Sequence, residues 1–280
     1  MANSSEYANY VGQATGNSVT NPGFSTDWYD QILRGAWYQS HGLSLSGGSD
    51  KMTYFLSGGY IEDQGIVIDN KFRRLNLRTN LDFKINKMVK TGIITNFSNI
   101  NNKTVNLGTA YNNAYRAAPI IQAKENGRYG NTSSYQNVGN PILDIENNNA
   151  RSYGNRIQAT GYLEVKPLDW ITLRSSMGGE LVSYSDKNYN YRFLNDEVTF
   201  LTAGGNQLNP KSNLSVYKEN NFRWVWDNTV TFNKKIDAHT FTLLVGSTAE
   251  EYTAENIRAF RQDVPADKNL WYIGTGDANT

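Results

Sequence analysis

The chain has 280 residues, a formal net charge of +1, 39% hydrophobic residues and 19% charged residues. A charge so close to balance excludes a strong field that would recruit nucleic acid or an anionic membrane surface. Cysteine is absent, which excludes disulfides and thiolate metal sites. The mean hydropathy of -0.59 and the 18 tyrosines suit extended strands and polar loops better than packed helices.

The first 37 residues are polar and rich in glycine and asparagine, and we expect them to form a lead-in to the first strand. The stretch Thr26–Leu33 is expected to hold one helical turn that is capped by Thr26 or Asp27. No signal peptide opens the sequence. Because an exported protein needs one, we expect the natural start to lie elsewhere.

Residues 38–99 show the alternation of four strands. In the first hairpin, Gly48 and Ser49 are predicted to form the turn, which would place Leu45 opposite Met52. The third strand alternates most clearly, and its apolar residues are Leu75, Leu77, Leu81, Phe83 and Ile85. Polar residues stand between them, so the sheet has one apolar and one polar face. Such a sheet belongs to a half-exposed sandwich or to a wide barrel with a wet lumen.

After these strands the alternation stops, and residues 100–152 are predicted to be a long extracellular loop. Within it, apolar residues at helical spacing predict one short helix between Leu107 and Ala118, which ends before Pro119. Strands five and six are predicted over residues 153–184. A second long loop is predicted over residues 185–220.

Strands seven and eight are predicted over residues 221–248, followed by a loop over residues 249–280. Short connections therefore alternate with long ones along the chain. The short ones are 48–49, 86–88, 167–169 and 233–238, and the long ones are 62–70, 100–152 and 185–220. A meander with its short turns at one end is typical of outer-membrane barrels, whereas a sandwich mixes the lengths. We predict an all-β fold: an antiparallel up-and-down meander of about eight strands, part of a large transmembrane β-barrel with long extracellular loops.

Several pieces of the chain carry a family resemblance. They are Thr26–Asp30, Leu43–Ser49, Tyr54–Tyr60, Gln64–Ile66, Arg74–Arg78, Asn140–Ile142 and Val165–Trp170. In order and spacing the chain resembles the SusC/RagA-type TonB-dependent transporters of Bacteroidetes outer membranes. Members of that family also carry a signal sequence, a TonB box and a plug domain, and close a barrel of 22 strands. None of those parts is recognisable here, so an interior barrel fragment with two unpaired edges is expected.

The resemblance implies import of nutrients across the cell outer membrane of a Gram-negative bacterium. Oligosaccharides or peptides would be taken up with energy from TonB, which would act through parts missing from this chain. A SusD-like surface lipoprotein would be the lid, and the bilayer would surround the wall. No nucleic acid, cofactor or metal is expected. The alternative is a soluble extracellular β-rich binding module or adhesin, and a barrel enzyme is a distant third.

Aromatic residues in the predicted loops and strand ends are the candidate ligand contacts. They are Tyr111, Tyr115, Tyr129, Tyr135, Tyr189, Tyr191 and Trp271. Aromatic faces stack on sugar rings and peptide side chains, although packing within a loop is the more ordinary role of any one of them. Tyr111 and Tyr115 are expected to share a helical face with alanines, which favours packing. No catalytic residue is predicted, because neither histidine, His41 or His239, has the spacing of a catalytic or zinc site.

Polar-face cations form a further set. They are Arg74, Arg78, Lys84, Arg156 and Arg174. In a barrel these side chains would line the lumen, and on a soluble sheet they would be ordinary solvated charges.

Overall fold

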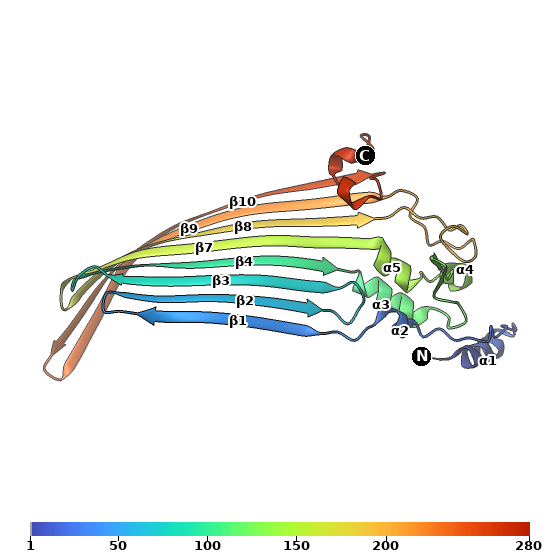
Figure 1. The fold of residues 1–280 in the computed structure, drawn as a ribbon, viewed down its shortest axis with the longest axis horizontal. Coiled ribbons are helices and arrows are strands. Elements are labelled where there is room, and N and C mark those ends of the chain that lie inside the picture. Colours follow the sequence, from blue (N-terminus) through green and yellow to red (C-terminus); the bar gives the residue numbers. More distant parts are fainter. Residues whose placement is uncertain (1) are drawn as a thin grey trace.

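The computed structural model describes residues 2–280, and most of them belong to one long, curved sheet (Figure 1). Its eight strands lie in chain order, and each pairs antiparallel with the next. They are β1 (Tyr38–Gly48), β2 (Met52–Gln64), β3 (Lys71–Lys84), β4 (Val89–Thr104), β7 (Asn148–Leu168), β8 (Ile171–Asn190), β9 (Asn213–Ile236) and β10 (His239–Gln262). The predicted meander of eight antiparallel strands is confirmed.

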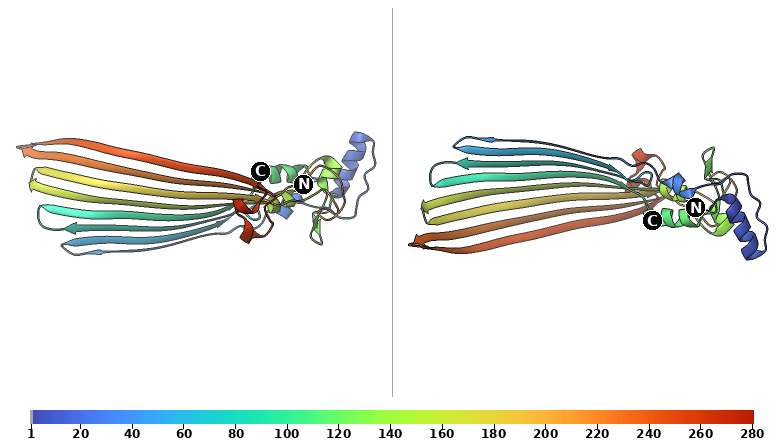
Figure 2. Two further views of the ribbon diagram at one scale, coloured as in Figure 1. Left: turned by 90° about the horizontal axis from the view of Figure 1, so that it is seen from above. Right: turned by 90° about the horizontal axis from the view of Figure 1, so that it is seen from below.

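Short turns lie at one end of the sheet, and helices and long loops form a cap at the other (Figures 1 and 2). The helices are α1 (Ser4–Thr15), α2 (Trp28–Ile32), α3 (Leu107–Arg116), α4 (Thr132–Gln136) and α5 (Pro141–Asn147). The strands β5 (Lys124–Glu125) and β6 (Arg128–Tyr129) form a small hairpin, and two 3-10 turns cover Lys268–Leu270 and Ile273–Thr275. Of the helices between residues 2 and 280, none has the length and apolar character to cross a bilayer.

Helix α1 lies in the segment that was predicted to be only a lead-in. The Asn3 side chain accepts from the backbone of Glu6, and the Glu6 carboxylate accepts from the backbone of Asn3, which forms a capping box. Gly16 ends the helix in the left-handed region at φ 72°, a conformation that glycine adopts without a Cβ clash.

The register of the sheet sorts its side chains into two faces. One row runs across six strands through Leu77, Phe97, Ile157, Leu181 and Phe222, with Gly58 of β2 beside Leu77. The neighbouring row on the opposite face runs through Arg78, Asn96, Gln158, Glu180, Arg223 and Tyr252. The predicted alternation is therefore confirmed. All five polar-face cations named above lie on the second face.

The apolar face is not covered by another layer of the described residues. Met177 and Leu181 lie in the inner strand β8, yet 50% and 53% of their surface is exposed. Exposed aliphatic side chains on a paired inner strand favour a lipid-facing wall over a soluble sandwich. Across residues 2–280, β1 and β10 each have one paired neighbour, so the sheet has the two unpaired edges that were expected.

The first turn differs from the prediction. The backbone N–H of Ser49 donates to the carbonyl of Met52 at 2.7 Å, so the two turn residues are Asp50 and Lys51. Leu45 therefore faces Leu56, not Met52. Gly47 and Gly48 belong to the strand, and Tyr54 lies over Gly47, where a Cβ would come within 2.5 Å of the tyrosine hydroxyl. The register differs by an even number of residues, so the faces remain as predicted.

The strands also continue beyond their predicted ends. Residues 148–152, 185–190 and 213–220 belong to β7, β8 and β9, and residues 249–262 belong to β10 instead of a loop. The helical content of the loop 100–152 is also larger than the one helix predicted, because α4 and α5 follow α3. These strand extensions carry polar residues on both faces, which removes the hydrophobic alternation that identifies a strand in sequence.

Two small hydrophobic cores lie in the cap. The larger one gathers buried residues of α2, α3 and α5, including Trp28 and Ile32, which are fully buried. The Trp28 indole N–H donates to the carbonyl of Ala118 at 3.0 Å. The smaller core contains Tyr189, Leu214, Val264 and Trp271. These cores make the cap a packed assembly.

Candidate functional site

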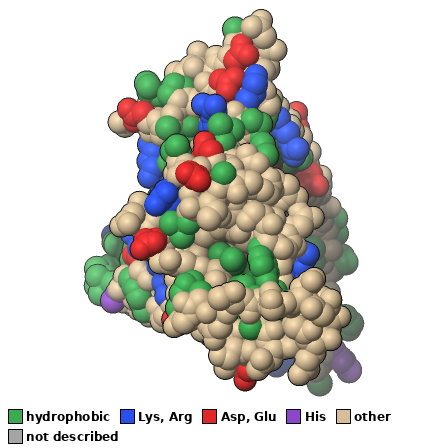
Figure 3. Space-filling view, turned by 90° about the vertical axis from the view of Figure 1, so that its right-hand side faces the viewer, with side chains coloured by type: hydrophobic (Ala, Val, Ile, Leu, Met, Phe, Trp, Pro, Cys, Tyr) green, Lys and Arg blue, Asp and Glu red, His purple; other side chains and the backbone are tan. Residues whose placement is uncertain are grey.

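The cap closes one end of the sheet, and its outer surface mixes charges of both signs (Figure 3). Two long loops make up much of it: the β4–β7 connection, residues 105–147, and the β8–β9 connection, residues 191–212. The Tyr129 backbone joins them, because its N–H donates to the carbonyl of Thr199 and its carbonyl accepts from Leu201, both at 2.9 Å.

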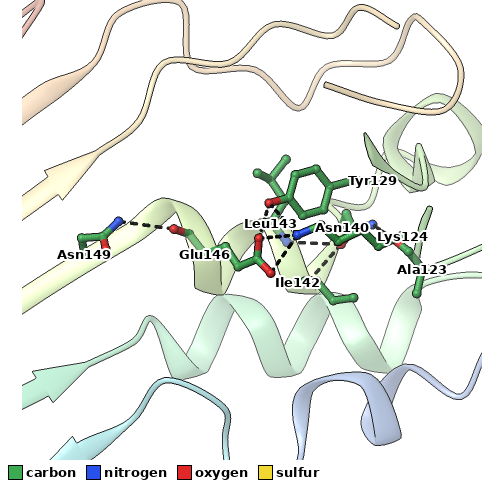
Figure 4. Close-up of polar contacts among 8 residues, drawn as sticks. All are labelled: Ala123, Lys124, Tyr129, Asn140, Ile142, Leu143, Glu146 and Asn149. Carbon is green, nitrogen blue, oxygen red and sulfur yellow. Dashed lines mark hydrogen bonds and ion pairs between the residues drawn. The ribbon is translucent and has the colours of Figure 1, made fainter. Parts of the chain in front are cut away.

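Asn140 is the polar centre of the cap (Figure 4). Its side chain is fully buried at the N-cap of α5, where Oδ1 accepts from the backbone of Ile142 at 2.9 Å and Leu143 at 3.2 Å. Its Nδ2 donates to the carbonyls of Ala123 at 3.1 Å and Gly130 at 2.9 Å. One amide thus caps a helix and ties it to both sides of the β5–β6 hairpin. Pro141 at the first helical position fits this start.

Lys124, Tyr129 and Glu146 form a second contact between the hairpin and α5 (Figure 4). The Lys124 ammonium lies 2.7 Å from the Glu146 carboxylate and 4.4 Å from the centre of the Tyr129 ring. The Tyr129 hydroxyl donates a short hydrogen bond to the same carboxylate. Burial and the neighbouring Glu146 raise the pKa of Tyr129, so the phenol keeps its proton and acts as a donor.

Gln207 connects the second loop to α5. Its Oε1 accepts from the Asn140 backbone at 2.7 Å, and its Nε2 donates to Asp144 at 3.0 Å. The other Asp144 oxygen accepts from Asn113 of α3 at 2.6 Å. Burial raises the pKa of Asp144, although these two amide donors oppose the shift. The carboxylate is therefore held by neutral donors, an arrangement that joins three segments of the cap.

Three of the candidate aromatic residues have exposed rings on the cap. Tyr111 and Tyr115 of α3 are 46% and 75% exposed, and Tyr135 of α4 is 41% exposed. Ala110 and Ala114 of α3 are buried. The expectation that Tyr111 and Tyr115 share a packed helical face with the alanines is therefore wrong. The three rings are therefore only partly packed. Tyr129 is half-buried in its contact with Lys124 and Glu146.

Tyr189, Tyr191 and Trp271 lie together elsewhere. The rings of Tyr189 and Trp271 stack with centroids 4.3 Å apart, and Tyr191 meets Tyr189 edge-on at 5.0 Å. Tyr189 and Trp271 are buried, with 1% and 7% of their surface exposed. By the alternation of β8, Tyr189 shares the apolar face with Leu181. The structure thus uses these rings to pack residues 263–280 onto the end of the sheet.

The polar face of the sheet carries linked charges. Glu180 lies 2.7 Å from Arg156, and Arg223 lies 2.5 Å from Glu250. Arg174 lies over the Tyr162 ring at 4.0 Å. Such a wall can contact polar groups, and the cap adds exposed phenols above it. These groups are carboxylates, guanidinium groups and phenols, which can hydrogen-bond to a polar solute.

The sequence did not identify the central role of Asn140 or Gln207. Asn140-Pro141 could have been read as an N-cap followed by a first-turn proline. Gln207 gave no local signal, because its partners lie more than 60 residues away in the chain.

No protein-family model matches this chain. Two curated relatives are similar to it along most of its length. The TonB-dependent receptor SusC of Bacteroides thetaiotaomicron is 26% identical over 270 residues, which cover 88% of this chain and 26% of that protein. The TonB-dependent receptor P26 of Formosa agariphila is 25% identical over 244 residues, which cover 84% of this chain and 23% of that protein. The chain thus spans about a quarter of the length of these relatives.

Solved structures of the RagAB peptide importer share the fold. In its closed-closed state the match has a TM-score of 0.74 at 17% identity and covers 99% of this chain and 35% of the matched chain. A second structure, of the RagAB peptide transporter, matches with a TM-score of 0.73 at 18% identity. The eight-stranded sheet and its cap therefore correspond to about a third of a receptor chain.

Proposed function

This chain belongs to the SusC/RagA-type TonB-dependent receptors of the outer membrane, and from that premise we propose that it imports oligosaccharides or peptides with energy from TonB. The sheet forms part of the barrel wall, with its apolar face toward lipid and its polar face toward the lumen. The cap lies on the cell surface. The family transports and does not catalyse a reaction, so no residue is assigned a catalytic role.

One observation carries the proposal: the alternation of the two faces continues across all eight strands. A wall with lipid on one side and a wet pore on the other needs this arrangement. The same feature argues against the soluble binding module, because Met177 and Leu181 would then expose half of their surfaces to water. Burial of the exposed half of such a side chain in lipid or protein is worth about 0.8–1.5 kcal/mol, half of the value for complete burial.

We assign the first ligand contacts to the exposed phenols of the cap. Tyr111, Tyr115 and Tyr135 present ring faces and hydroxyl groups to whatever enters from outside. A SusD-like lipoprotein would cover the same end of the molecule as a lid. RagAB is a peptide importer by name, which makes peptides and oligosaccharides the two ligand classes to compare.

The test is uptake by the native bacterium, with the intact gene and with a deletion. Radiolabelled oligosaccharides and peptides are offered separately, each with and without a protonophore that removes the energy for TonB. We expect one ligand class to enter only with the intact gene and only while the membrane is energised. Uptake that survives the deletion or the protonophore refutes the proposal.

The location is checked in the same cells by fractionation. We expect the protein in the outer membrane and its release only by detergent. Recovery as a soluble monomer in buffer would support the soluble binding module instead. Co-purification with a surface lipoprotein, compared between the natural protein and Tyr115→Ala, tests the proposed lid.

A further inference from the structure

A row of four cations crosses the sheet at its cap end. The row runs through Lys71, Lys103, Arg151 and Lys187, which face one another across β3, β4, β7 and β8. Each cation lies six positions along its strand from a member of the apolar row that contains Leu77 and Leu181. An even spacing keeps a strand residue on the same face, so the four cations share the apolar face. Neighbouring strands are about 4.8 Å apart, which places the four charges within about 15 Å.

The described residues compensate only part of this charge. Lys71 forms an ion pair with Glu62, and the same carboxylate lies 3.3 Å from Arg73. Lys103 lies 2.9 Å from Asp69. No carboxylate of residues 2–280 lies within 4.0 Å of the other two cations of the row. Like charges that face one another across a sheet are destabilising, so the row favours an anion from outside these residues.

Arg151 and Lys187 are held in place without being neutralised. The Lys187 ammonium donates to the carbonyl of Trp271 at 3.3 Å and lies 5.1 Å from the centre of the Tyr272 ring. Neither of these groups carries a charge. The Nε–H of Arg151 is buried and has no hydrogen-bond partner among residues 2–280. Because buried donors are normally paired, this end of the row is short of acceptors.

A second row on the same face adds two cations. It runs through Glu62, Arg73, Asn101, Tyr153, Ser185 and Lys218. The two rows together hold six cations and one carboxylate, that of Glu62. Between them and the apolar row lies a row of neutral polar residues, in which the Asn99 amide donates to Asn155 at 2.7 Å. The outer face therefore changes from apolar to neutral polar to cationic toward the cap.

The height of the cations indicates which anion can reach them. The two rows lie four and six positions beyond the apolar row, which corresponds to about 10 and 15 Å above it at a strand tilt of about 40°. The polar layer of a bilayer extends only about 5–8 Å beyond the hydrocarbon on each side. A phosphate on glycerol is therefore too low for the upper row. A phosphate on a sugar headgroup can stand higher.

We propose that the two rows bind the phosphate groups of a glycolipid in the outer leaflet of the membrane. The proposal rests on the proposed function, which turns the apolar face toward lipid. The Arg151 guanidinium can bind a phosphate through two parallel hydrogen bonds, and the lysines on either side of it add point charges. The bound phosphates neutralise the row and fix the height of the wall in the membrane.

The test titrates the complete receptor, purified in a nonionic detergent, with three lipids. They are lipopolysaccharide as the phosphorylated glycolipid, the same lipopolysaccharide after enzymatic dephosphorylation, and phosphatidylglycerol. Combined Lys103→Gln, Arg151→Gln and Lys187→Gln should weaken binding of the intact lipopolysaccharide about a hundredfold, because each cation near an anionic lipid contributes about fivefold. Dephosphorylation should weaken binding to the natural protein to a similar extent. Binding of phosphatidylglycerol should change by less than about threefold in the variant.

Two control variants separate charge at this place from charge in general. Combined Lys103→Arg, Arg151→Lys and Lys187→Arg keeps the cations and should retain affinity within about fivefold. Combined Arg78→Gln, Arg156→Gln and Arg174→Gln removes the same charge from β3, β7 and β8 on the opposite face. This second control should bind lipopolysaccharide within about threefold of the natural protein.

Each outcome supports or overturns the proposal. Binding of lipopolysaccharide that the three glutamines or the dephosphorylation leave unchanged overturns it, as does an equal loss in the control on the opposite face. An equal loss for phosphatidylglycerol overturns the glycolipid assignment, and binding of none of the three lipids overturns the site itself. In these cases a closed barrel, shown by heat-modifiable mobility, leaves the import function standing. A receptor that is a soluble monomer without detergent refutes both.

Discussion

Replacement of Asn140 by alanine tests whether one buried amide holds the cap together. The change removes the cap of α5, which is worth about 0.5–2 kcal/mol. It also removes one of the two donors of the Ala123 and Gly130 carbonyls, which keep the backbone N–H of Gly130 at 3.0 Å and of Thr132 at 3.1 Å, at about 0.5–1.5 kcal/mol each. Since these losses are not fully additive, we expect the cap to lose roughly 2–4 kcal/mol of local stability.

Native-state hydrogen exchange of the complete receptor measures this loss. Amides of residues 123–147 should exchange about thirtyfold to a thousandfold faster, while those of the inner strands remain unchanged. Asn140→Asp keeps an oxygen that accepts from the helix backbone, but its carboxylate would face the carbonyl oxygens of Ala123 and Gly130. We therefore expect this variant to leave the cap no more stable than Asn140→Ala does. Asn112→Ala, an exposed asparagine of α3, is the control. Exchange within about twofold of the natural protein in Asn140→Ala would refute the reasoning.

Three further predictions concern other parts of the molecule. Trp271→Ala should expose residues 263–280 to proteases, because the stacked contact with Tyr189 is lost, at a cost of about 3–5 kcal/mol; ligand affinity should not change, and a loss of affinity would return Trp271 to the ligand site. Burial raises the pKa of Asp144. At a pH between its unfolded and folded pKa values, the folded cap therefore binds more protons than the unfolded chain does. Cap protection should therefore rise as the pH falls through the raised pKa toward the ordinary value of an aspartate, and be lost as the pH rises through the raised pKa; Asp144→Asn should abolish this dependence, and a dependence of the opposite sign contradicts it. Gly92→Val should lower the free energy of unfolding of the receptor by about 1–3 kcal/mol, because a Cβ at Gly92 lies 2.6 Å from the Tyr162 ring. The urea midpoint should fall accordingly; an unchanged midpoint would show that the Tyr162 ring moves aside at little cost.

The faces of the sheet could be predicted because each strand carries its own evidence. Leu75 and Leu77 are separated by one polar residue, and that spacing alone places them on one side. The exact turn was less certain, because Gly47 and Gly48 resemble turn residues. Their real role is to admit the Tyr54 ring from the neighbouring strand, a contact that local sequence does not reveal.

The cap could be predicted only in part. The helix at Leu107–Arg116 showed its periodicity, and α1 had an unrecognised capping signal in Asn3 and Glu6. The contacts that assemble the cap join residues far apart, such as Asn140 and Gln207. Candidate ligand residues were chosen for being aromatic and in predicted loops. That criterion included Tyr189, which is buried against Trp271 by contacts that local sequence does not reveal.

The stagger of the hairpins sets how far the wall stands above the bilayer. Lys84 continues beyond the start of β2, 166–168 continue beyond the start of β4, and 233–236 continue beyond the start of β8. A progression of roughly one to four residues per hairpin corresponds to a strand tilt of about 40°. At 24 residues, β9 is about 80 Å long and rises about 60 Å at that tilt.

The apolar band of an outer-membrane barrel is about 25 Å tall. More than half of the height of β9 therefore lies outside the hydrocarbon. On the cap side this part of the wall stands in water, so a solute meets the protein well before it reaches the depth of the lipids. Water and ions, not acyl chains, are the solvent that the outer surface of this upper part has to match.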